Sequence, residues 1–296
     1  MTYFSSRPQT CTHRDLYRLA DFTFELAQPP LPVPAHFRIF QVQTGAPDYR
    51  FTLETAESLS WDRTDFQVRK DQLSIAIEDG LETRYLCLPG SDRPYAVSRE
   101  LDEGHSLVTV SRADLDLLRF DTLFCSLLSL ERRLHHRGCY VLHSAFTVYK
   151  GEAILFTAPS GVGKSTQAGL WEQYQGAQVI NGDRSLLQFR EGQLYASGWP
   201  VCGSSGVCRN ESYPVRAIVL LQQARENRVD RLSEKEYTLR LMREITINYH
   251  DPGFFDGALA FIARLIGGTE LVQLSCDISP QAVECLHRAL YGGAAL

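Results

Sequence analysis

The sequence predicts an α/β fold with a β-rich N-terminal domain, and three observations lead to this prediction. Residues 36–112 contain short segments in which apolar and polar residues alternate, as they do in half-buried strands. Residues 140–223 contain strand-like and helix-like segments, which together are typical of an α/β core. The stretch AILFTAPSGVGKSTQAGLW, residues 153–171, runs from an apolar strand through a glycine-rich turn into a helix.

Length and composition restrict the class of protein. The chain has 296 residues, of which 44% are apolar, so it can bury the core of one large domain or two modest ones. Its apolar runs are far shorter than the roughly 20 residues that cross a bilayer, and its first residues lack the features of a secretory signal. We therefore expect a cytoplasmic protein with no membrane partner.

Charge and cysteine content argue against further classes. The formal charge of −5 and the lack of a lysine or arginine block disfavour a nucleic-acid surface, because nucleic-acid affinity depends mostly on neutralised phosphates. The eight cysteines are scattered without a C-x-x-C pair, so we interpret them as reduced thiols rather than zinc or redox ligands. The chain is expected to bind no nucleic acid.

The N-terminal domain is expected to span residues 1–115 and to consist of short strands. A Glu-Asp-Gly turn at residues 78–80 separates two of these segments and fits a hairpin. The predicted strands are residues 36–43, 49–56, 66–77, 83–90 and 106–112. The residue pattern of this domain indicates no particular chemistry.

A connecting helix is predicted over residues 121–138. Apolar residues recur there at helical spacing, with Asp121 placed to cap the start and Gly138 placed to end the helix. Its last turn is rich in positive charge, which the helix dipole favours. We interpret the two histidines of that turn, His135 and His136, as solvated structural residues.

The second domain, residues 116–296, is expected to hold the α/β core. Two strands precede the glycine-rich turn and one helix follows it, and a later hairpin is expected to turn at Glu191 and Gly192. The predicted strands are residues 140–149, 152–158, 177–181, 184–189, 194–198 and 216–223, and the predicted helices are 166–175, 233–246 and 279–293.

The glycine-rich turn, APSGVGKS, completes the phosphate-loop pattern G-x-x-x-x-G-K-[ST], except that Ala158 holds the first glycine position. Its two glycines lie where successive backbone N–H groups must turn inward, and the helix that follows directs its free N–H groups to the same point. Lys164 can reach the β and γ phosphates of a nucleotide, and Ser165 can bind a magnesium ion.

Nucleotide phosphate binding is therefore favoured over a merely structural glycine turn. The residues expected to bind the nucleotide are Ser160, Gly161, Val162, Gly163, Lys164, Ser165 and Thr166.

Asp183 is a candidate base or metal ligand. It follows Lys164 by 19 residues, at the end of the next strand after the phosphate-loop helix. If these strands are parallel neighbours, their ends lie side by side and bring Asp183 toward the magnesium ion and the γ phosphate. In the alternative interpretation, Asn181, Gly182 and Asp183 form a plain hairpin turn. A switch GTPase is disfavoured because no N-K-x-D tetrapeptide occurs.

The run LHSAFTVYKGEAILFTAPSGVGKSTQAGLW, continued by AQVINGDRSLLQF, resembles the catalytic domain of HPr kinase/phosphorylase and related kinases that share a nucleotide core with phosphoenolpyruvate carboxykinase. The resemblance covers roughly residues 138–223. It rests on His143 in LHSA, on Lys164 and Ser165 in the loop SG-x-GKS, and on Asp183. It implies a P-loop core of this type, in which His143 approaches the phosphates and Asp183 acts as base or metal ligand.

Two departures from that family matter. Its early acidic pair is reduced here to GDR, so that either Gly182 or Arg184 replaces one aspartate. The C-terminal segment that supports phosphate-driven dephosphorylation is not found, so phosphorylase activity is not carried over. Arg184 could neutralise phosphate charge or could simply solvate a turn.

The loop GWPVCGSSGVCRNE, residues 198–211, could close over the site or could be an exposed connection. Its candidate substrate contacts are Cys202, Ser204, Ser205 and Arg209.

These observations predict an ATP- and Mg²⁺-dependent, HPr-kinase-like phosphotransferase that moves the γ phosphate to a hydroxyl of a peptide, protein or small molecule. The expected catalytic residues are Asp183, His143 and Lys164, and the expected metal ligands are Ser165 and Asp183. Two alternatives remain open: a small-molecule P-loop kinase, and a nucleotide-binding regulatory module without transfer chemistry, which the reduced acidic pair favours. The sequence is compatible with a homo-oligomer.

Overall fold

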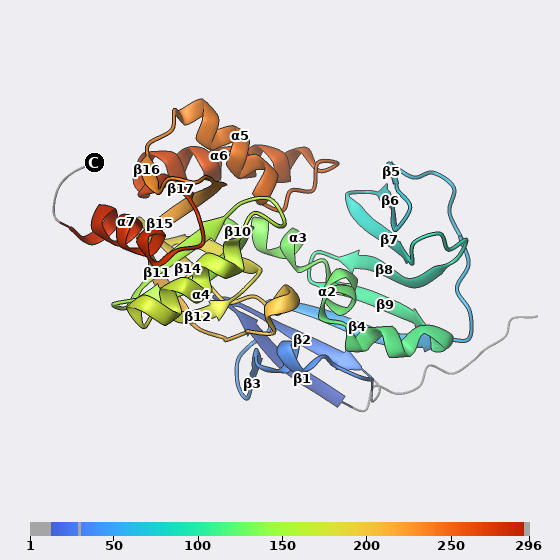
Figure 1. The fold of residues 1–296 in the computed structure, drawn as a ribbon. Helices are drawn as coiled ribbons and strands as arrows, with labels where there is room; N and C mark the ends of the chain where they lie inside the picture. The colour runs from blue at the N-terminus through green and yellow to red at the C-terminus, as the bar shows by residue number, and fades with distance from the viewer. Residues whose placement is uncertain (1–12, 29–30, 293–296) are drawn as a thin grey trace, which may run out of the picture. The chain divides into compact units, whose positions relative to one another are not determined.

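The computed structural model describes residues 13–28 and 31–292, and the chain divides into two compact units, the first ending at Leu130 and the second beginning at Glu131 (Figure 1). Each unit contains a large β-sheet, and helices accompany both sheets, so the fold is of the predicted α/β class. No helix within residues 13–28 and 31–292 is both long and apolar enough to cross a membrane.

The first unit is built on a nine-stranded sheet with the order β3-β1-β2-β4-β9-β8-β7-β6-β5. Its strands are β1 (His13–Leu19), β2 (Phe22–Gln28), β3 (Gln41–Val42), β4 (Tyr49–Ala56), β5 (Val68–Arg69), β6 (Leu73–Glu78), β7 (Leu81–Cys87), β8 (Pro94–Asp102) and β9 (His105–Ser111). The β2–β4 and β4–β9 pairs are parallel and the other pairs are antiparallel. Asp79 and Gly80, with φ of 51° and 80°, turn the chain between β6 and β7, which confirms the predicted hairpin.

Residues 36–43, predicted as a strand, form instead the short helix α1 (Ala35–Arg38) and the two-residue strand β3. The apolar residues of this segment fit either structure, and a tertiary contact decides between them. Phe37 is fully buried, with its ring 4.9 Å from that of Tyr17 and 4.8 Å from that of Phe124. The strand prediction was wrong here because an aromatic cluster from distant segments surrounds Phe37.

The hairpin of β1 and β2 was not predicted. Residues 22–26 of β2, FTFEL, do alternate apolar and polar residues, which is a strand signal, and in the structure six of the seven residues of β2 are buried. Its neighbours β1 and β4 cover its two edges.

The predicted single helix over residues 121–138 is two helices, α2 (Asp121–Leu128) and α3 (Leu130–His135), which follow the 3-10 helix η1 (Arg112–Arg119). Ser129, with φ 46° and ψ 46°, separates them. Leu128 and Leu130 would lie about 200° apart around one continuous helix. Both are buried, one on each side of the change of direction at Ser129.

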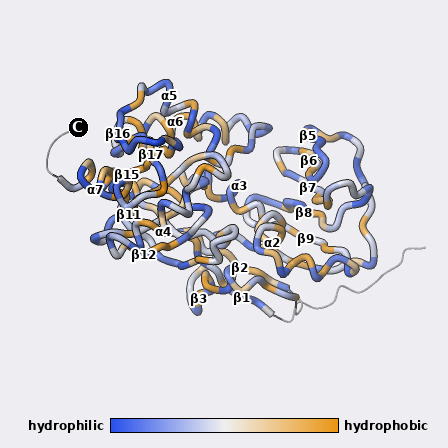
Figure 2. The backbone as a smooth tube through the Cα atoms, viewed as in Figure 1, coloured by the Kyte–Doolittle hydropathy of each residue, from blue (hydrophilic) through white to orange (hydrophobic). Residues whose placement is uncertain are grey.

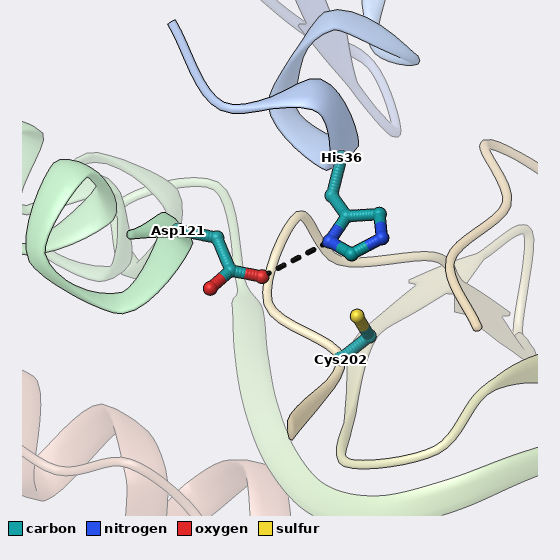
Figure 3. A group of neighbouring side chains, drawn as sticks. All are labelled: His36, Asp121 and Cys202. Carbon is teal, nitrogen blue, oxygen red and sulfur yellow. Dashed lines mark hydrogen bonds and ion pairs between the residues drawn. The ribbon is translucent and has the colours of Figure 1, made fainter. Parts of the chain in front are cut away.

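Asp121 was expected to cap this helix, but the N-cap residue is Phe120. The Asp121 carboxylate accepts a hydrogen bond from His36 Nδ1 at 3.2 Å (Figure 3). This contact connects α2 to α1 within the first unit.

The interpretation of the histidines at the end of α3 was correct for His136, which is exposed, and wrong for His135. His135 is 8% exposed, and its ring stacks on that of Phe254 at 4.4 Å. Burial and the neighbouring His136 lower the pKa of His135, so its ring is held in the neutral form.

The second unit contains the strand order β11-β10-β13-β14-β15-β17-β16, with β12 also paired to β10. Its strands are β10 (Cys139–Tyr149), β11 (Glu152–Thr157), β12 (Gln178–Asn181), β13 (Arg184–Arg190), β14 (Gln193–Ser197), β15 (Ser212–Gln223), β16 (Arg228–Asp230) and β17 (Leu271–Cys276). Its helices are α4 (Lys164–Gln175), η2 (Gly203–Ser205), α5 (Glu234–Glu244), α6 (Pro252–Gly268) and α7 (Pro280–Tyr291). Glu191 and Gly192 turn the chain between β13 and β14, as predicted.

A ring of pairings closes the sheet of the second unit. The strand β11 pairs with both β10 and β15, while β13 and β14 connect β10 to β15 by the other route. The long strands β10 and β15 therefore belong to both halves of the sheet. This arrangement brings the end of β11 close to the junction of β12 and β13.

The strand β15 separates the two hydrophobic cores of the unit. Ile218 and Leu220 pack with residues of α5 and α6, whereas Val219 and Leu221 pack with residues of α4 and α7. Successive residues of a strand point to opposite faces, so both faces of the sheet are covered by helices. Hydrophobic residues, orange in Figure 2, gather around β15 and β17.

We expect Leu265→Ala to lower the free energy of unfolding of the second unit by about 2–5 kcal/mol, because Leu265 is fully buried in α6. The matched control is Leu239→Ala in α5, where the side chain is 54% exposed and the expected change is within about 0.5 kcal/mol. Urea unfolding measures both. Equal effects of the two substitutions would contradict the described core.

Candidate functional site

The predicted phosphate loop, residues 158–165, runs from the end of β11 into the first turn of α4. Gly161 and Gly163 have φ of 81° and 119°, a region of backbone conformation that favours glycine. Among the described residues, no atom lies within 4 Å of a Cβ built at either glycine, so conformation rather than lack of space requires them. The first N–H of α4 with an intrahelical acceptor belongs to Gln167, which donates to Gly163 O at 2.9 Å. The N–H groups before it are available to an anion.

The predicted nucleotide-binding residues occupy this loop and the first turn of α4. Ser160, Gly161, Ser165 and Thr166 are exposed, and Val162 and Gly163 are half-buried. Lys164 is only 7% exposed, and its ammonium donates to Ala158 O at 2.8 Å and to Pro159 O at 3.4 Å. Burial lowers the pKa of Lys164. A phosphate would compete with the two carbonyls for this ammonium.

A residue that the sequence did not indicate supports the loop. Gln223, at the end of β15, donates from its side-chain amide to Val162 O at 3.2 Å. Because β15 runs parallel to β11, its carboxyl end lies beside the loop that β11 enters.

Asp183 does not lie in a hairpin turn. The strands β12 and β13 both pair antiparallel with β10, through Phe146↔Asn181 and His143↔Arg184. Gly182 and Asp183 therefore form a bend between two successive strands that pair with the same neighbour, β10. The hairpin alternative is wrong. The expectation of neighbouring parallel strands is also wrong, because β10 lies between β11 and β12.

The buried side chain of Asn181 shapes this bend. Its Oδ1 accepts hydrogen bonds from the backbone N–H groups of Asp183 and Arg184 at 2.8 and 2.9 Å. Its Nδ2 donates to Trp199 O at 2.8 Å and to Val201 O at 3.1 Å. One side chain therefore connects the bend to the start of the loop 198–211.

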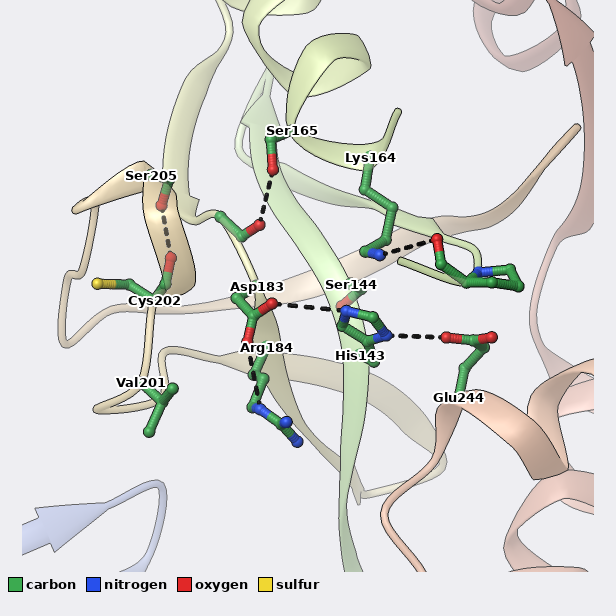
Figure 4. A network of polar contacts seen from close by, with 12 residues as sticks. His143, Ser144, Lys164, Ser165, Asp183, Arg184, Val201, Cys202, Ser205 and Glu244 are labelled. Atoms are coloured by element: carbon green, nitrogen blue, oxygen red, sulfur yellow. Dashed lines mark hydrogen bonds and ion pairs between the residues drawn. The ribbon is translucent and has the colours of Figure 1, made fainter. Parts of the chain in front are cut away.

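The bend brings Asp183 close to the phosphate loop and to β10 (Figure 4). The Ser165 hydroxyl donates to Gly182 O at 3.1 Å. His143 Nε2 lies 3.5 Å from Asp183 Oδ1, and Arg184 Nε lies 3.3 Å from Asp183 Oδ2. Of the predicted catalytic and metal residues, Asp183, His143 and Ser165 are thus neighbours, with Lys164 preceding Ser165 on α4.

Glu244 completes this network and was not indicated by the sequence. Its carboxylate accepts a hydrogen bond from His143 Nδ1 at 2.9 Å. Glu244 is the last residue of α5, and the bridge Leu142↔Ile245 holds the end of this helix against β10. The two partners are 101 residues apart in the chain, so no local pattern relates them.

The charges of the network favour one protonation state. Hydrogen bonds to Asp183 and Glu244 raise the pKa of His143, and the hydrogen bond from His143 is the largest cause that lowers the pKa of Asp183. His143 is therefore stabilised as an imidazolium, with Nδ1 donating to Glu244 and Nε2 in an ion pair with Asp183, and Asp183 is stabilised as a carboxylate. The Arg184 guanidinium further stabilises the carboxylate.

The loop 198–211 packs against the bend. A Cβ built at Gly203 would lie 3.1 Å from Asp183 Cγ, and one built at Gly182 would lie 2.1 Å from Ser205 Oγ. Of the other predicted contacts in this loop, Cys202 is buried, Ser204 is exposed and Arg209 donates to Val179 O at 3.3 Å. The loop thus brings Ser205 to the site, while Arg209 bonds to β12.

Comparisons with known proteins gave two similarities. A family model described as SynChlorMet cassette protein ScmC matches residues 108–246, somewhat less than half of the chain. The solved Hpr(Ser) kinase/phosphatase from Coxiella burnetii is similar at 16% identity and a TM-score of 0.29, covering 50% of this chain and 93% of that one. No curated protein matches the sequence. The range 108–246 contains the phosphate loop, Asp183, His143 and Glu244.

We expect Glu244→Ala to lower the pKa of His143 toward the ordinary value of 6.5, because one of the two carboxylates that stabilise the imidazolium is lost. The histidine titration followed by NMR measures this change. Glu234→Ala, at the exposed start of the same helix, is the matched control and should leave the titration of His143 as it is.

The raised pKa of His143 also has a consequence for stability. The imidazolium stabilises the folded state fully below the unfolded pKa of 6.5, and this contribution is lost as pH rises through the raised folded pKa. His143→Gln should therefore lower the melting temperature more at about pH 6 than at about pH 9. Melting curves at both pH values test this, and an equal loss at the two would count against the charged state.

Proposed function

We propose that this protein is an ATP- and Mg²⁺-dependent phosphotransferase that moves the γ phosphate to a hydroxyl of a peptide, a protein or a small molecule. The observation that carries the proposal is the hydrogen bond from Ser165 Oγ to Gly182 O at 3.1 Å. It places the serine of the phosphate loop next to the residue that precedes Asp183. The proposed phosphate site and a carboxylate are thus adjacent, an arrangement that supports phosphoryl transfer.

The residues of the site fit a nucleotide and a magnesium ion. Free N–H groups at the start of α4 and the Lys164 ammonium suit the phosphates. The exposed Ser165 hydroxyl and the Asp183 carboxylate are oxygen ligands of the kind that Mg²⁺ prefers. The bound magnesium nucleotide would supply the phosphoryl group to be transferred. In this proposal, Ser160 to Thr166 bind the nucleotide and Ser165 and Asp183 hold the metal.

The protein residues would position the reactants and stabilise charge. Lys164 would exchange its carbonyl partners, Ala158 O and Pro159 O, for phosphate oxygens and neutralise them. Asp183 would accept the proton of the acceptor hydroxyl, an assistance typically worth roughly 10² to 10⁴ in rate. His143, oriented by Glu244, would hold the Asp183 carboxylate in place.

A second candidate is a nucleotide-binding module without transfer chemistry. It is favoured by the contacts of Asp183 with His143 and Arg184, which lower the pKa of the carboxylate and make it a weaker base. ATP labelled on the γ phosphate distinguishes the two functions. Transfer of label to an acceptor supports the phosphotransferase, whereas binding without transfer or hydrolysis supports the module.

We expect Mg²⁺-ATP to raise the melting temperature of the protein, because a ligand that binds only the folded state stabilises it. Lys164→Ala should abolish this rise, since the phosphates lose their ammonium partner. Lys235→Ala, an exposed lysine on α5, is the matched control and should keep it. An unchanged rise in Lys164→Ala would argue against the proposed phosphate site.

Asp183→Asn should affect turnover more than nucleotide binding. The amide keeps an oxygen near the metal but cannot take up the proton, so we expect a loss of turnover of roughly 10²- to 10⁴-fold. Formation of ADP from Mg²⁺-ATP measures turnover, and the melting temperature measures binding. Asp256→Asn on the exposed side of α6 is the control. Equal turnover in Asp183→Asn and wild type would remove Asp183 from the mechanism.

A further inference from the structure

We propose that Ser205 is a phosphate acceptor within this chain, so that the protein phosphorylates itself on the loop 198–211. This inference rests on the proposed function and names one acceptor for it, a seryl hydroxyl in a glycine-flanked loop. Three observations support it. Asn181 attaches the loop to β12, Ser205 lies against Gly182 beside the site, and the bonds of the Ser205 hydroxyl lie within the loop.

Both arms of the loop are attached to β12. Asn181 Nδ2 bonds to the carbonyls of Trp199 and Val201, and Asn181 forms a β-bridge with Cys208. The segment between these attachments includes η2, whose first residue, Gly203, lies against the side chain of Asp183. The start of η2 is therefore held against the candidate base, and Ser205 lies two residues further along this short helix.

Ser205 faces the site across Gly182. A Cβ on Gly182 would lie 2.1 Å from Ser205 Oγ, so the hydroxyl occupies the space that any other side chain would fill. The carbonyl of the same glycine accepts the hydroxyl of Ser165, the proposed metal ligand. Figure 4 shows Ser205, Ser165 and Asp183 around this bend. Only one glycine residue thus separates the loop hydroxyl from the proposed metal and phosphate site.

The Ser205 hydroxyl is held by bonds that a rotation of its own side chain can break. It donates to Cys202 O at 2.7 Å and accepts from the Val207 N–H at 3.2 Å, both within the loop. Ser205 is exposed, which leaves room for a phosphate. Gly203 and Gly206, with φ of 57° and 66°, lie on either side of it and ease a local change of backbone.

Ser205, ATP and Asp183 together account for every bond and proton of the transfer. Ser205 Oγ attacks the γ phosphorus, so that a new O–P bond forms while the bond from this phosphorus to the β,γ-bridging oxygen breaks. ADP leaves, and the hydroxyl proton passes to Asp183 and then to solvent. The product is a phosphoserine of charge about −1.5 to −2 beside the Asp183 carboxylate. Repulsion between the two would drive the loop away from the bend.

The test uses the full chain, first treated with a phosphatase and then incubated with Mg²⁺ and ATP labelled on the γ phosphate. We expect up to one phosphate per chain, located on Ser205 by mass spectrometry of peptides. The rate per chain should be independent of protein concentration, as for transfer within one molecule. Ser205→Ala should lose the label, Ser204→Ala should keep it, and Asp183→Asn should lose it.

Other outcomes would overturn the inference alone or the proposed function as well. Label on Ser204 or elsewhere, or a rate per chain that rises with protein concentration, would overturn the assignment to Ser205 within the same molecule. A rise in melting temperature with ADP formation but no label would overturn this inference alone and leave the proposed function intact. If the melting temperature does not rise and no label is found, both this inference and the proposed function are overturned. Unfolding of Ser205→Ala without nucleotide should match wild type, which confirms that the variant folds.

Discussion

The candidate site depends on the hydrogen bonds of one buried side chain, that of Asn181. Its carbonyl oxygen accepts two backbone N–H groups of the bend, and its amide nitrogen donates to two carbonyls of the loop 198–211. A buried polar group left without its partner costs about 1–3 kcal/mol, so these bonds hold the bend and the loop together firmly. The position of Asp183 beside Ser165 follows from this arrangement, since Gly182 joins the two.

The charged groups of the candidate site balance one another. The cationic groups of Lys164, His143 and Arg184 lie near the carboxylates of Asp183 and Glu244. Each carboxylate has a cationic neighbour, while the Lys164 ammonium rests on backbone carbonyls, which are weaker partners than phosphate oxygens. The Lys164 ammonium is therefore the cation that a polyanion would bind with the smallest loss of existing interactions. The same balance makes Asp183 a weaker base than an isolated carboxylate.

The sheet of the second unit explains why residues far apart in the chain converge. β10 pairs with β11, β12 and β13, so His143, the predicted phosphate loop and the bend lie around one strand. The helices α5 and α6 pack on one face and α4 and α7 on the other. The end of α5 delivers Glu244 to His143, and the start of α4 delivers Lys164 and Ser165. Rigid elements therefore hold the charged groups, whereas Ser205 lies on a loop.

The sequence by itself determined the features that depend on neighbouring residues. Gly161 and Gly163 mark the turn of the predicted phosphate loop because only glycine readily adopts their backbone conformation, and the turns at Gly80 and Gly192 follow the same rule. The α/β class followed from the order of strand and helix patterns.

The tertiary structure alone decided the features that depend on distant residues. Phe37 lies in a helix because aromatic rings from other segments surround it, and the predicted long helix is interrupted at Ser129, with buried leucines on both sides. The pairing of β12 with β10, and not with β11, sets the position of Asp183. Glu244 meets His143 across 101 residues of chain. Local patterns reveal which face of an element is apolar, but strand pairing and helix packing decide which elements meet.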